Sequence, residues 1–287
     1  MVLAIGAGVA AVGSLYWRYR AWRESVLTPR LWAAAAHGWT DDVRHFLADG
    51  ANIEGRGTWG CTPLQIAAYC GHDSVVLLLL EHGADASTTD GACATSIHYA
   101  ALRGDEEVMR LLVQKVADLS IKDDIGETAL HCAAWQGHHV VLQILIEKGA
   151  DVSATNNLGM TPLHFAARYA HVVGCSLLLE AGADVSAQDI AGATPLHEAA
   201  RWNREPVVQL LLDRGADVLV RDTAGATPED HAISQSHLQV EAILTLRREV
   251  RRALCAAFAM GQQERLGAGS WVLALEPGVV QMVLEQV

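Results

Sequence analysis

The sequence predicts an all-α solenoid built from short helical repeats. A threonine-led segment returns every 33 residues without an insertion, helix-spaced apolar stripes follow it, and glycine closes most units. The leading threonines are Thr62, Thr95, Thr128, Thr161, Thr194 and Thr227. A period of this length is typical of repeat proteins, in which each unit buries its apolar face against its neighbours. We therefore expect one array rather than separate globular domains.

Each unit reads as turn, helix, helix, turn. Thr161-Pro162 illustrates the opening of the first helix, because a threonine side chain caps free amides and proline at the first helical position loses no needed donor. The small pair Ala166-Ala167 lets neighbouring helices approach closely. The fourth residue of the unit is Gln65, His98, His131, His164, His197 and then Asp230.

The second helix of each unit carries an apolar stripe. Val75, Val76 and Leu79 have the spacing of a helix buried along one face. Glycine then takes a left-handed turn without a steric penalty, at Gly83, Gly149, Gly182 and Gly215. Val116 stands at this place in the third unit, so we expect an altered turn there, and Cys93 replaces the glycine that precedes the threonine in other units.

The motif T-P-L-H-x-A on a 33-residue period resembles the ankyrin-repeat family. The resemblance runs from about Leu31 to Leu244, as about seven repeats with a degenerate first one. It implies that the recurrent histidines hydrogen-bond backbone in the adjoining turn. Their spacing of roughly 10 Å along a stack argues against a metal site or a proton relay.

In ankyrin proteins the hairpin tips and the exposed side of each first helix form a concave binding surface. By register this surface includes Ile66, Tyr99, Cys132, Phe165 and Glu198. Aromatic and arginine side chains, which dominate interface hot spots, are frequent at the neighbouring positions. The predicted protein-binding residues are Trp59, Tyr69, Arg103, Trp135, Leu158, Arg168, Tyr169, Arg201 and Trp202. That any one of them packs against the next repeat instead is the open alternative.

Residues 1–17 form an apolar run followed by a basic and aromatic flank. A helix of this length reaches about 26 Å, the lower limit for crossing a hydrocarbon core. The positive charge follows the run, unlike in a cleaved secretory signal. We expect a membrane anchor, with Gly6, Ala10 and Ser14 as a small-residue stripe and Trp17 and Arg18 at the interface. A cap on the first repeat and a targeting peptide are the alternatives.

The expected domain boundaries follow from these segments. They are a hydrophobic helix with its flank at 1–23, a linker at 24–30, the repeat array at 31–244 and capping helices at 245–287. Within the last region we expect a helix to about Met260, a loop, and an amphipathic helix over 278–287. The tail weakly resembles adaptors with an F-box or SOCS box, but packing on the final repeat is expected because a solenoid end needs a cap.

Composition excludes several function classes. The net charge of −12 disfavours nucleic-acid partners. The six cysteines form no C-x-x-C pair, which fits a reducing compartment and disfavours zinc. The sequence has no phosphate-binding glycine loop and no recognisable catalytic constellation. We therefore expect no enzyme activity, no cofactor, no metal and no small-molecule substrate.

Two functions are consistent with these observations. The first is an accessory or structural subunit of a multi-protein membrane complex, anchored through residues 1–17 in an organelle membrane, with a mitochondrial one favoured. Its groove would bind other protein subunits. The alternative is a soluble cytoplasmic adaptor that binds a client through the groove and a ubiquitin ligase or other effector through its C-terminal tail.

Overall fold

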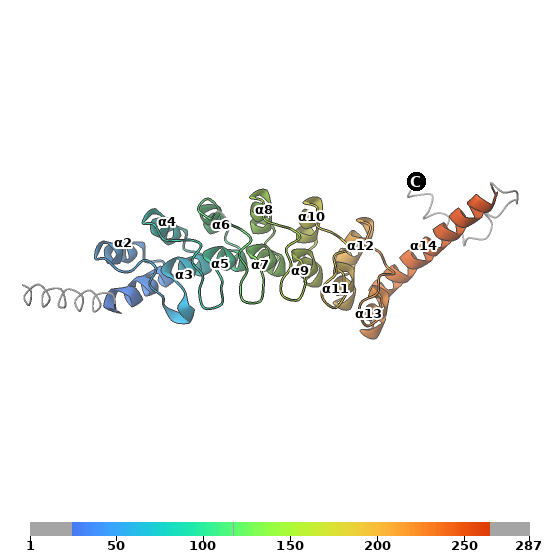
Figure 1. Cartoon of the computed structure of the whole chain (residues 1–287), viewed down its shortest axis with the longest axis horizontal. Helices are drawn as coiled ribbons and strands as arrows, with labels where there is room; N and C mark the ends of the chain where they lie inside the picture. Colours follow the sequence, from blue (N-terminus) through green and yellow to red (C-terminus); the bar gives the residue numbers. More distant parts are fainter. Residues whose placement is uncertain (1–24, 117, 265–287) are drawn as a thin grey trace, which may run out of the picture. The chain divides into compact units, whose positions relative to one another are not determined.

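A computed structural model describes residues 25–116 and 118–264, which are helices and loops without a strand in these ranges. Residues 25–37 are helical. The following elements are α2 (Thr40–Ala48), the 3-10 turn η1 (Thr58–Gly60), α3 (Pro63–Cys70), α4 (Asp73–Glu81), α5 (Ser96–Arg103), α6 (Glu106–Val113), α7 (Ala129–Gln136), α8 (His139–Glu147), α9 (Pro162–Arg168), α10 (Val172–Glu180), α11 (Pro195–Arg201), α12 (Glu205–Asp213), α13 (Pro228–Ser234) and α14 (Leu238–Glu264) (Figure 1). The all-α solenoid expected from the sequence is confirmed for the repeats.

The chain divides into two compact units. The N-terminal unit comprises Met1–Pro162 with Glu180–Ala183, and the C-terminal unit comprises Leu163–Leu179 with Asp184–Val287. The division falls at α9 and α10.

The N-terminal unit consists of two layers of helices. The first helices α3, α5 and α7 pack in one row, and the second helices α4, α6 and α8 form a second row, drawn above the first in Figure 1. Ala67 and Ala100 are fully buried where the first helices meet, and Leu79 and Leu112 fill the second layer. Small side chains let the helices of the first row pack closely, whereas leucine side chains supply the buried apolar area that stabilises each repeat.

Capping explains why each first helix begins at its threonine. In α5 the backbone N–H of Thr95 donates to Nδ1 of His98 at 3.1 Å. Because a backbone N–H can only donate, Nδ1 accepts and the ring is neutral with its proton on Nε2. Nε2 then donates to the carbonyl of Glu127 in the next hairpin at 3.2 Å. Equivalent bonds join His131 to Met160 and His197 to Ala226, so the structural role expected for the histidines is confirmed.

The C-terminal unit repeats this arrangement and ends on a long helix. α11 packs on α13, and α12 packs on α14. α14 is a single helix of 27 residues whose first part is the second helix of the last repeat. Arg247 and Arg251 of α14 form ion pairs with Asp213 and Asp217, which fix the helix against α12 and the turn after it.

Two expected boundaries differ from the structure. The linker expected at 24–30 is helical from residue 25 and continuous with the first repeat. Pro29 stands in register where other units place the capping threonine, so no threonine cap starts the helix at that point. The boundary expected between residues 244 and 245 falls inside α14, which runs to Glu264 rather than to about Met260. Arg248 occupies the register of Gly215, so no left-handed glycine ends the helix there.

The expected membrane anchor lies outside the described residues. It comprises residues 1–17, with Gly6, Ala10, Ser14 and Trp17, and the adjoining Arg18. Among residues 25–116 and 118–264 no helix combines the length and the apolar character needed to cross a bilayer. The tail helix expected over 278–287 also lies outside the described ranges.

The turn after α6 is altered, as expected from its sequence. The four glycines at this place in other units have φ between 86° and 92°. Val116 is not among the described residues with positive φ, and its N–H bonds to the carbonyl of Leu112 at 3.0 Å. A β-branched side chain disfavours the left-handed region. The N–H of Val116 therefore bonds four residues back, whereas the N–H of Gly83 bonds three residues back, to Leu80.

Cys93 carries backbone strain at a hairpin tip. Its φ is 60°, whereas Gly126 and Gly159 occupy the same register at 82° and 73°. We expect Cys93→Gly to raise the free energy of unfolding by about 1 kcal/mol, because glycine adopts this conformation without a steric penalty. Urea unfolding followed by circular dichroism checks this. Cys93→Ala is the matched control: it retains the Cβ, so an equal gain there would contradict backbone strain as the cause.

Candidate protein-binding site

The predicted binding residues fall into both units. Trp59, Tyr69, Arg103, Trp135 and Leu158 belong to the N-terminal unit, and all five are exposed. In the C-terminal unit Tyr169 and Trp202 are exposed, whereas Arg168 and Arg201 are half-buried. Tyr69 and Trp135 share one register position, and Tyr169 and Trp202 share the next one. In each unit these exposed rings are suited to protein contacts.

Trp59 owes its position to an unusual first hairpin. Gly57 stands where later units have an Asp or Asn that hydrogen-bonds the hairpin backbone. A Cβ at Gly57 would lie 2.4 Å from the indole of Trp32, so only glycine fits beneath that ring. The hairpin closes through η1, with Trp59 in a left-handed conformation at φ 60°. The Trp59 side chain is 77% exposed.

Trp59 and Tyr69 share an apolar pocket with Tyr99. The cavity measures about 280 Å³ and is lined by Trp59, Cys61, Gln65, Ile66, Tyr69 and Tyr99. The rings of Tyr69 and Tyr99 meet edge to face, with centroids 5.8 Å apart. η1, α3 and α5 each contribute one ring, so the pocket exists only when two adjacent repeats are folded. Trp135 and Leu158 do not line it.

Asp90 binds two of the residues that line this pocket. The Oδ2 atom of Asp90 accepts hydrogen bonds from the Tyr99 hydroxyl and from the Cys61 thiol. Burial alone would raise the pKa of Asp90, but the Tyr99 hydroxyl and the backbone N–H of Ala92 outweigh it and lower the pKa. Burial raises the pKa of the Cys61 thiol. Cys61 is therefore protonated at neutral pH and a poor nucleophile.

In the C-terminal unit a buried carboxylate holds both predicted arginines. The Glu198 side chain is 1% exposed, and its Oε2 accepts from Nε of Arg168 at 2.7 Å. Its Oε1 lies 3.5 Å from Nη1 of Arg201. The two guanidinium groups are thus fixed on the surface by one carboxylate, which also compensates part of their charge.

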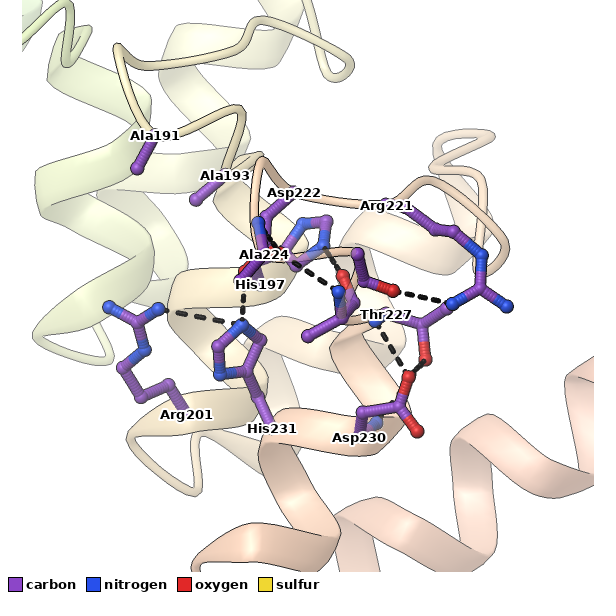
Figure 2. Close-up of polar contacts among 12 residues, drawn as sticks. Ala191, Ala193, His197, Arg201, Arg221, Asp222, Ala224, Thr227, Asp230 and His231 are labelled. Carbon is purple, nitrogen blue, oxygen red and sulfur yellow. Dashed lines mark hydrogen bonds and ion pairs between the residues drawn. The ribbon is translucent and has the colours of Figure 1, made fainter.

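This charged cluster extends to the last repeat. Figure 2 shows His231 between Arg201 and Asp222. Nη2 of Arg201 lies 3.4 Å from Nε2 of His231, which in turn lies 2.8 Å from Oδ2 of Asp222. Burial alone would raise the pKa of Asp222, but the hydrogen bonds from His231 and the backbone N–H of Ala226 lower it. The cluster joins α11, α13 and the hairpin before α13.

Replacing Glu198 tests whether the cluster stabilises the C-terminal unit. We expect Glu198→Gln to lower the free energy of unfolding by about 2 kcal/mol, because it leaves the half-buried charge of Arg168 without its carboxylate. Asp41→Asn is the control, since Asp41 pairs with Arg44 at an exposed position, where a pair contributes about 0 to 1 kcal/mol. Equal losses in the two variants, measured by urea unfolding, would contradict the assignment.

One set of register positions does not face solvent as expected. Ile66, Cys132, Phe165 and Glu198 are buried, and Tyr99 is half-buried. The fifth residue of each motif differs in size and polarity from repeat to repeat, but it is buried or half-buried in these five repeats. The type of residue at this position is more informative for predicting its contacts. Tyr99 and His231 each donate a hydrogen bond to an aspartate that stands nine residues earlier in the sequence.

Three comparisons bear on identity. The profile described as "Ankyrin repeats (3 copies)" matches residues 24–90, 91–156 and 154–222. An ankyrin repeat-containing protein of Schizosaccharomyces pombe is 35% identical over 66 residues, which span 23% of this chain and 32% of that protein. The match thus covers about a third of the length of this curated relative.

Among solved structures, the chain is similar to the crystal structure of the ankyrin repeat domain of Bcl-3, described as a unique member of the IkappaB protein family. The TM-score is 0.64 at 30% identity, and the alignment covers 75% of this chain and 97% of that domain. Ankyrin repeats are generally modules for protein–protein interaction. The family profile matches well over half of the sequence, and the repeat register and capping geometry agree with it: this chain belongs to the ankyrin-repeat family.

Proposed function

We propose that this protein is a non-catalytic scaffold, an accessory subunit of a multi-protein membrane complex. Its exposed aromatic side chains would bind neighbouring subunits, and residues 1–17 would hold it at an organelle membrane, with a mitochondrial one favoured. The observation that supports binding most directly is the exposure of Tyr69 and Trp135 in one unit and of Tyr169 and Trp202 in the other. Large aromatic side chains of this kind contribute strongly to interfaces.

The membrane part of the proposal rests on the sequence. Residues 1–17 have the length and composition of a short anchor, and arginines and aromatic residues follow them at the expected interface. The repeats would then face the compartment on the positively charged side of the anchor. A reducing compartment fits the six cysteines, none of which is in a disulfide.

Alkaline carbonate extraction tests the anchor. The full chain is compared with a chain lacking residues 1–17. If the full chain stays in the membrane pellet and the shortened chain is released, the anchored subunit is supported. Release of both contradicts the anchor and favours the alternative, a soluble adaptor whose C-terminal tail recruits an effector such as a ubiquitin ligase.

Co-purification tests the binding surface. We expect a quadruple variant to fail to co-purify with the proteins that cross-link to the wild-type chain. Its four substitutions are Tyr69→Ala, Trp135→Ala, Tyr169→Ala and Trp202→Ala. The matched control is Leu77→Ala, Val173→Ala, which removes exposed apolar side chains from the second helices α4 and α10. If the control loses the same proteins, or the aromatic variant keeps them, the proposed surface is wrong.

A further inference from the structure

We propose that the pocket of Trp59, Tyr69 and Tyr99 accepts one leucine-sized apolar side chain from an acidic segment of a partner protein. This inference rests on the proposed function, because Tyr69 belongs to the proposed protein-binding surface and the inference specifies the chemistry of the partner segment that binds there. It concerns only the N-terminal unit, whose η1, α3 and α5 supply the three rings.

The size of the cavity points to a side chain rather than a small-molecule ligand. Its volume of about 280 Å³ is at the lower limit of the range of about 300 to 1,000 Å³ that is typical of small-molecule sites, which suits one side chain better than a drug-sized molecule. Ile66 forms part of the lining, and Tyr69 and Tyr99 meet at an interplanar angle of 82°. Two perpendicular rings and the exposed indole of Trp59 surround a single compact group.

The polar groups of the lining are already occupied, which requires an apolar ligand. Gln65 accepts from the backbone N–H of Thr62 and donates to the carbonyls of Thr88 and Ala94. The Tyr99 hydroxyl and the Cys61 thiol both bond Asp90. A polar ligand group would lose its bonds to water without gaining replacements here, whereas an apolar group would lose nothing.

Trp59 provides an independent reason to expect an occupant. It is a bulky residue in the left-handed region, at φ 60°, yet its side chain is 77% exposed. Such a conformation costs about 1 to 3 kcal/mol, and strained residues cluster at functional sites. Packing within the described unit recovers little of this cost. Contact with a partner would bury the indole and recover more.

Charge selects an acidic segment around that side chain. Nη1 of Arg56 is fixed by the carbonyls of Gly60 and Thr89, beside the tip that carries Trp59. Arg103 is exposed and lies next to Gly71, which follows the end of α3 that carries Tyr69. A Cβ built on Gly71 would be 3.5 Å from Nε of Arg103. Asp90 and Asp105 keep their negative charge while they accept hydrogen bonds from Tyr99 and from the N–H of Val108. Asp90 is buried and Asp105 is half-buried, so a docking segment meets the two exposed arginines first.

The net charge of −12 would repel an acidic segment at low salt. At physiological ionic strength, however, the Debye length is about 8 Å, so exposed charges farther away are largely screened. The two arginines beside the pocket therefore decide the local preference. Each exposed pair with a partner carboxylate contributes up to about 1 kcal/mol.

Peptide binding to the full chain tests the proposal, with lipid nanodiscs where residues 1–17 require a bilayer. The probe is a dye-labelled peptide with a central leucine, flanked on each side by glycine and a pair of glutamates. Fluorescence polarisation should give a Kd about tenfold lower than for the same peptide with serine at the centre. The peptide with lysines in place of the glutamates should bind about fivefold more weakly.

Variants locate the binding site. Tyr69→Ala should weaken the leucine peptide about fivefold, and Arg103→Glu should reverse the preference between glutamate and lysine flanks. Leu77→Ala is the control, because Leu77 is an exposed apolar side chain on α4 that does not line the pocket, and this variant should bind like the wild type. Circular dichroism confirms that each variant is folded.

Each outcome decides the proposal. Three results would overturn it: equal binding of the leucine and serine peptides, stronger binding of the lysine peptide, or no binding up to about 1 mM peptide. A Kd of about 1 mM corresponds to a binding free energy of about 4 kcal/mol. Failure here is distinguishable from failure of the proposed function. If the cross-linked proteins are lost only in the aromatic variant while the peptide fails, the scaffold function stands and the pocket assignment falls.

Discussion

Acidification from about pH 7.5 to about pH 5.5 is expected to destabilise the protein by up to about 4 kcal/mol through three buried histidines. Burial lowers the pKa of His98, His164 and His197 below the ordinary value of 6.5, against the opposing effect of the carbonyls that their rings face. The unfolded chain therefore binds more protons than the native chain below pH 6.5. Stability is complete above that pH and falls as the pH drops towards each native pKa.

The array itself supplies the control for this prediction. Gln65 occupies the histidine position in the second repeat and makes the same kinds of bond, accepting from Thr62 and donating to the carbonyls of the next hairpin. The variant His98→Gln, His164→Gln, His197→Gln should keep the fold at neutral pH. Because glutamine does not titrate, its stability should depend much less on pH.

Urea unfolding at several pH values, followed by circular dichroism, measures both proteins. The wild-type midpoint should fall steeply below pH 6.5, and the midpoint of the glutamine variant should fall less. Parallel curves would contradict the assignment of acid sensitivity to these histidines. A loss of stability at neutral pH alone would instead indicate that glutamine does not reproduce the imidazole bonds.

Gly104→Ala is expected to lower the free energy of unfolding by about 3 kcal/mol, whereas Gly83→Ala should lower it by about 1 kcal/mol. Both glycines adopt similar left-handed conformations, with φ of 80° and 86°. A Cβ at Gly104 would lie 2.4 Å from Nδ1 of His138, while nothing lies within 4 Å of one at Gly83. The backbone penalty is thus shared, and only Gly104→Ala displaces a neighbour.

The displaced neighbour is part of the packing between repeats. Nε2 of His138 donates to the carbonyl of Leu102 at 3.2 Å, so moving the ring breaks a bond between α5 and the turn before α8. A double-mutant cycle with His138→Ala measures this coupling by urea unfolding. If Gly104→Ala costs the same with and without the His138 ring, the steric explanation is wrong.

The repeat period, the capping threonines and the histidine role could be read from the sequence because they are local and repeated. Thr95 and His98 lie within one helical turn, and the same geometry recurs at Thr128 and Thr194. The exposure of Trp59, Tyr69 and Trp202 could be anticipated for the same reason: their register places them at the hairpin tips and helix ends.

Helix ends were less predictable where a repeat departs from the common pattern. The sequence suggested a break near residue 244 because the repeat motif stops there. The helix continues through Arg248, since the residue that ends second helices elsewhere is a glycine, and an arginine that pairs with Glu229 favours continuation. A missing stop signal carries structural information that a motif search overlooks.

The sequence by itself determined the family, the helix order and the exposure of Trp59, Tyr69, Trp135, Tyr169 and Trp202, whereas Tyr99 and Phe165, expected at the surface, are half-buried and buried. Only the tertiary structure decided which of these side chains meet. Tyr69 meets Tyr99 at one pocket, and Arg168 meets Glu198, because residues 30 positions apart are brought together when adjacent repeats pack. Periodicity fixes the face on which a residue lies, whereas contact across repeats depends on side-chain size and on the backbone of each hairpin.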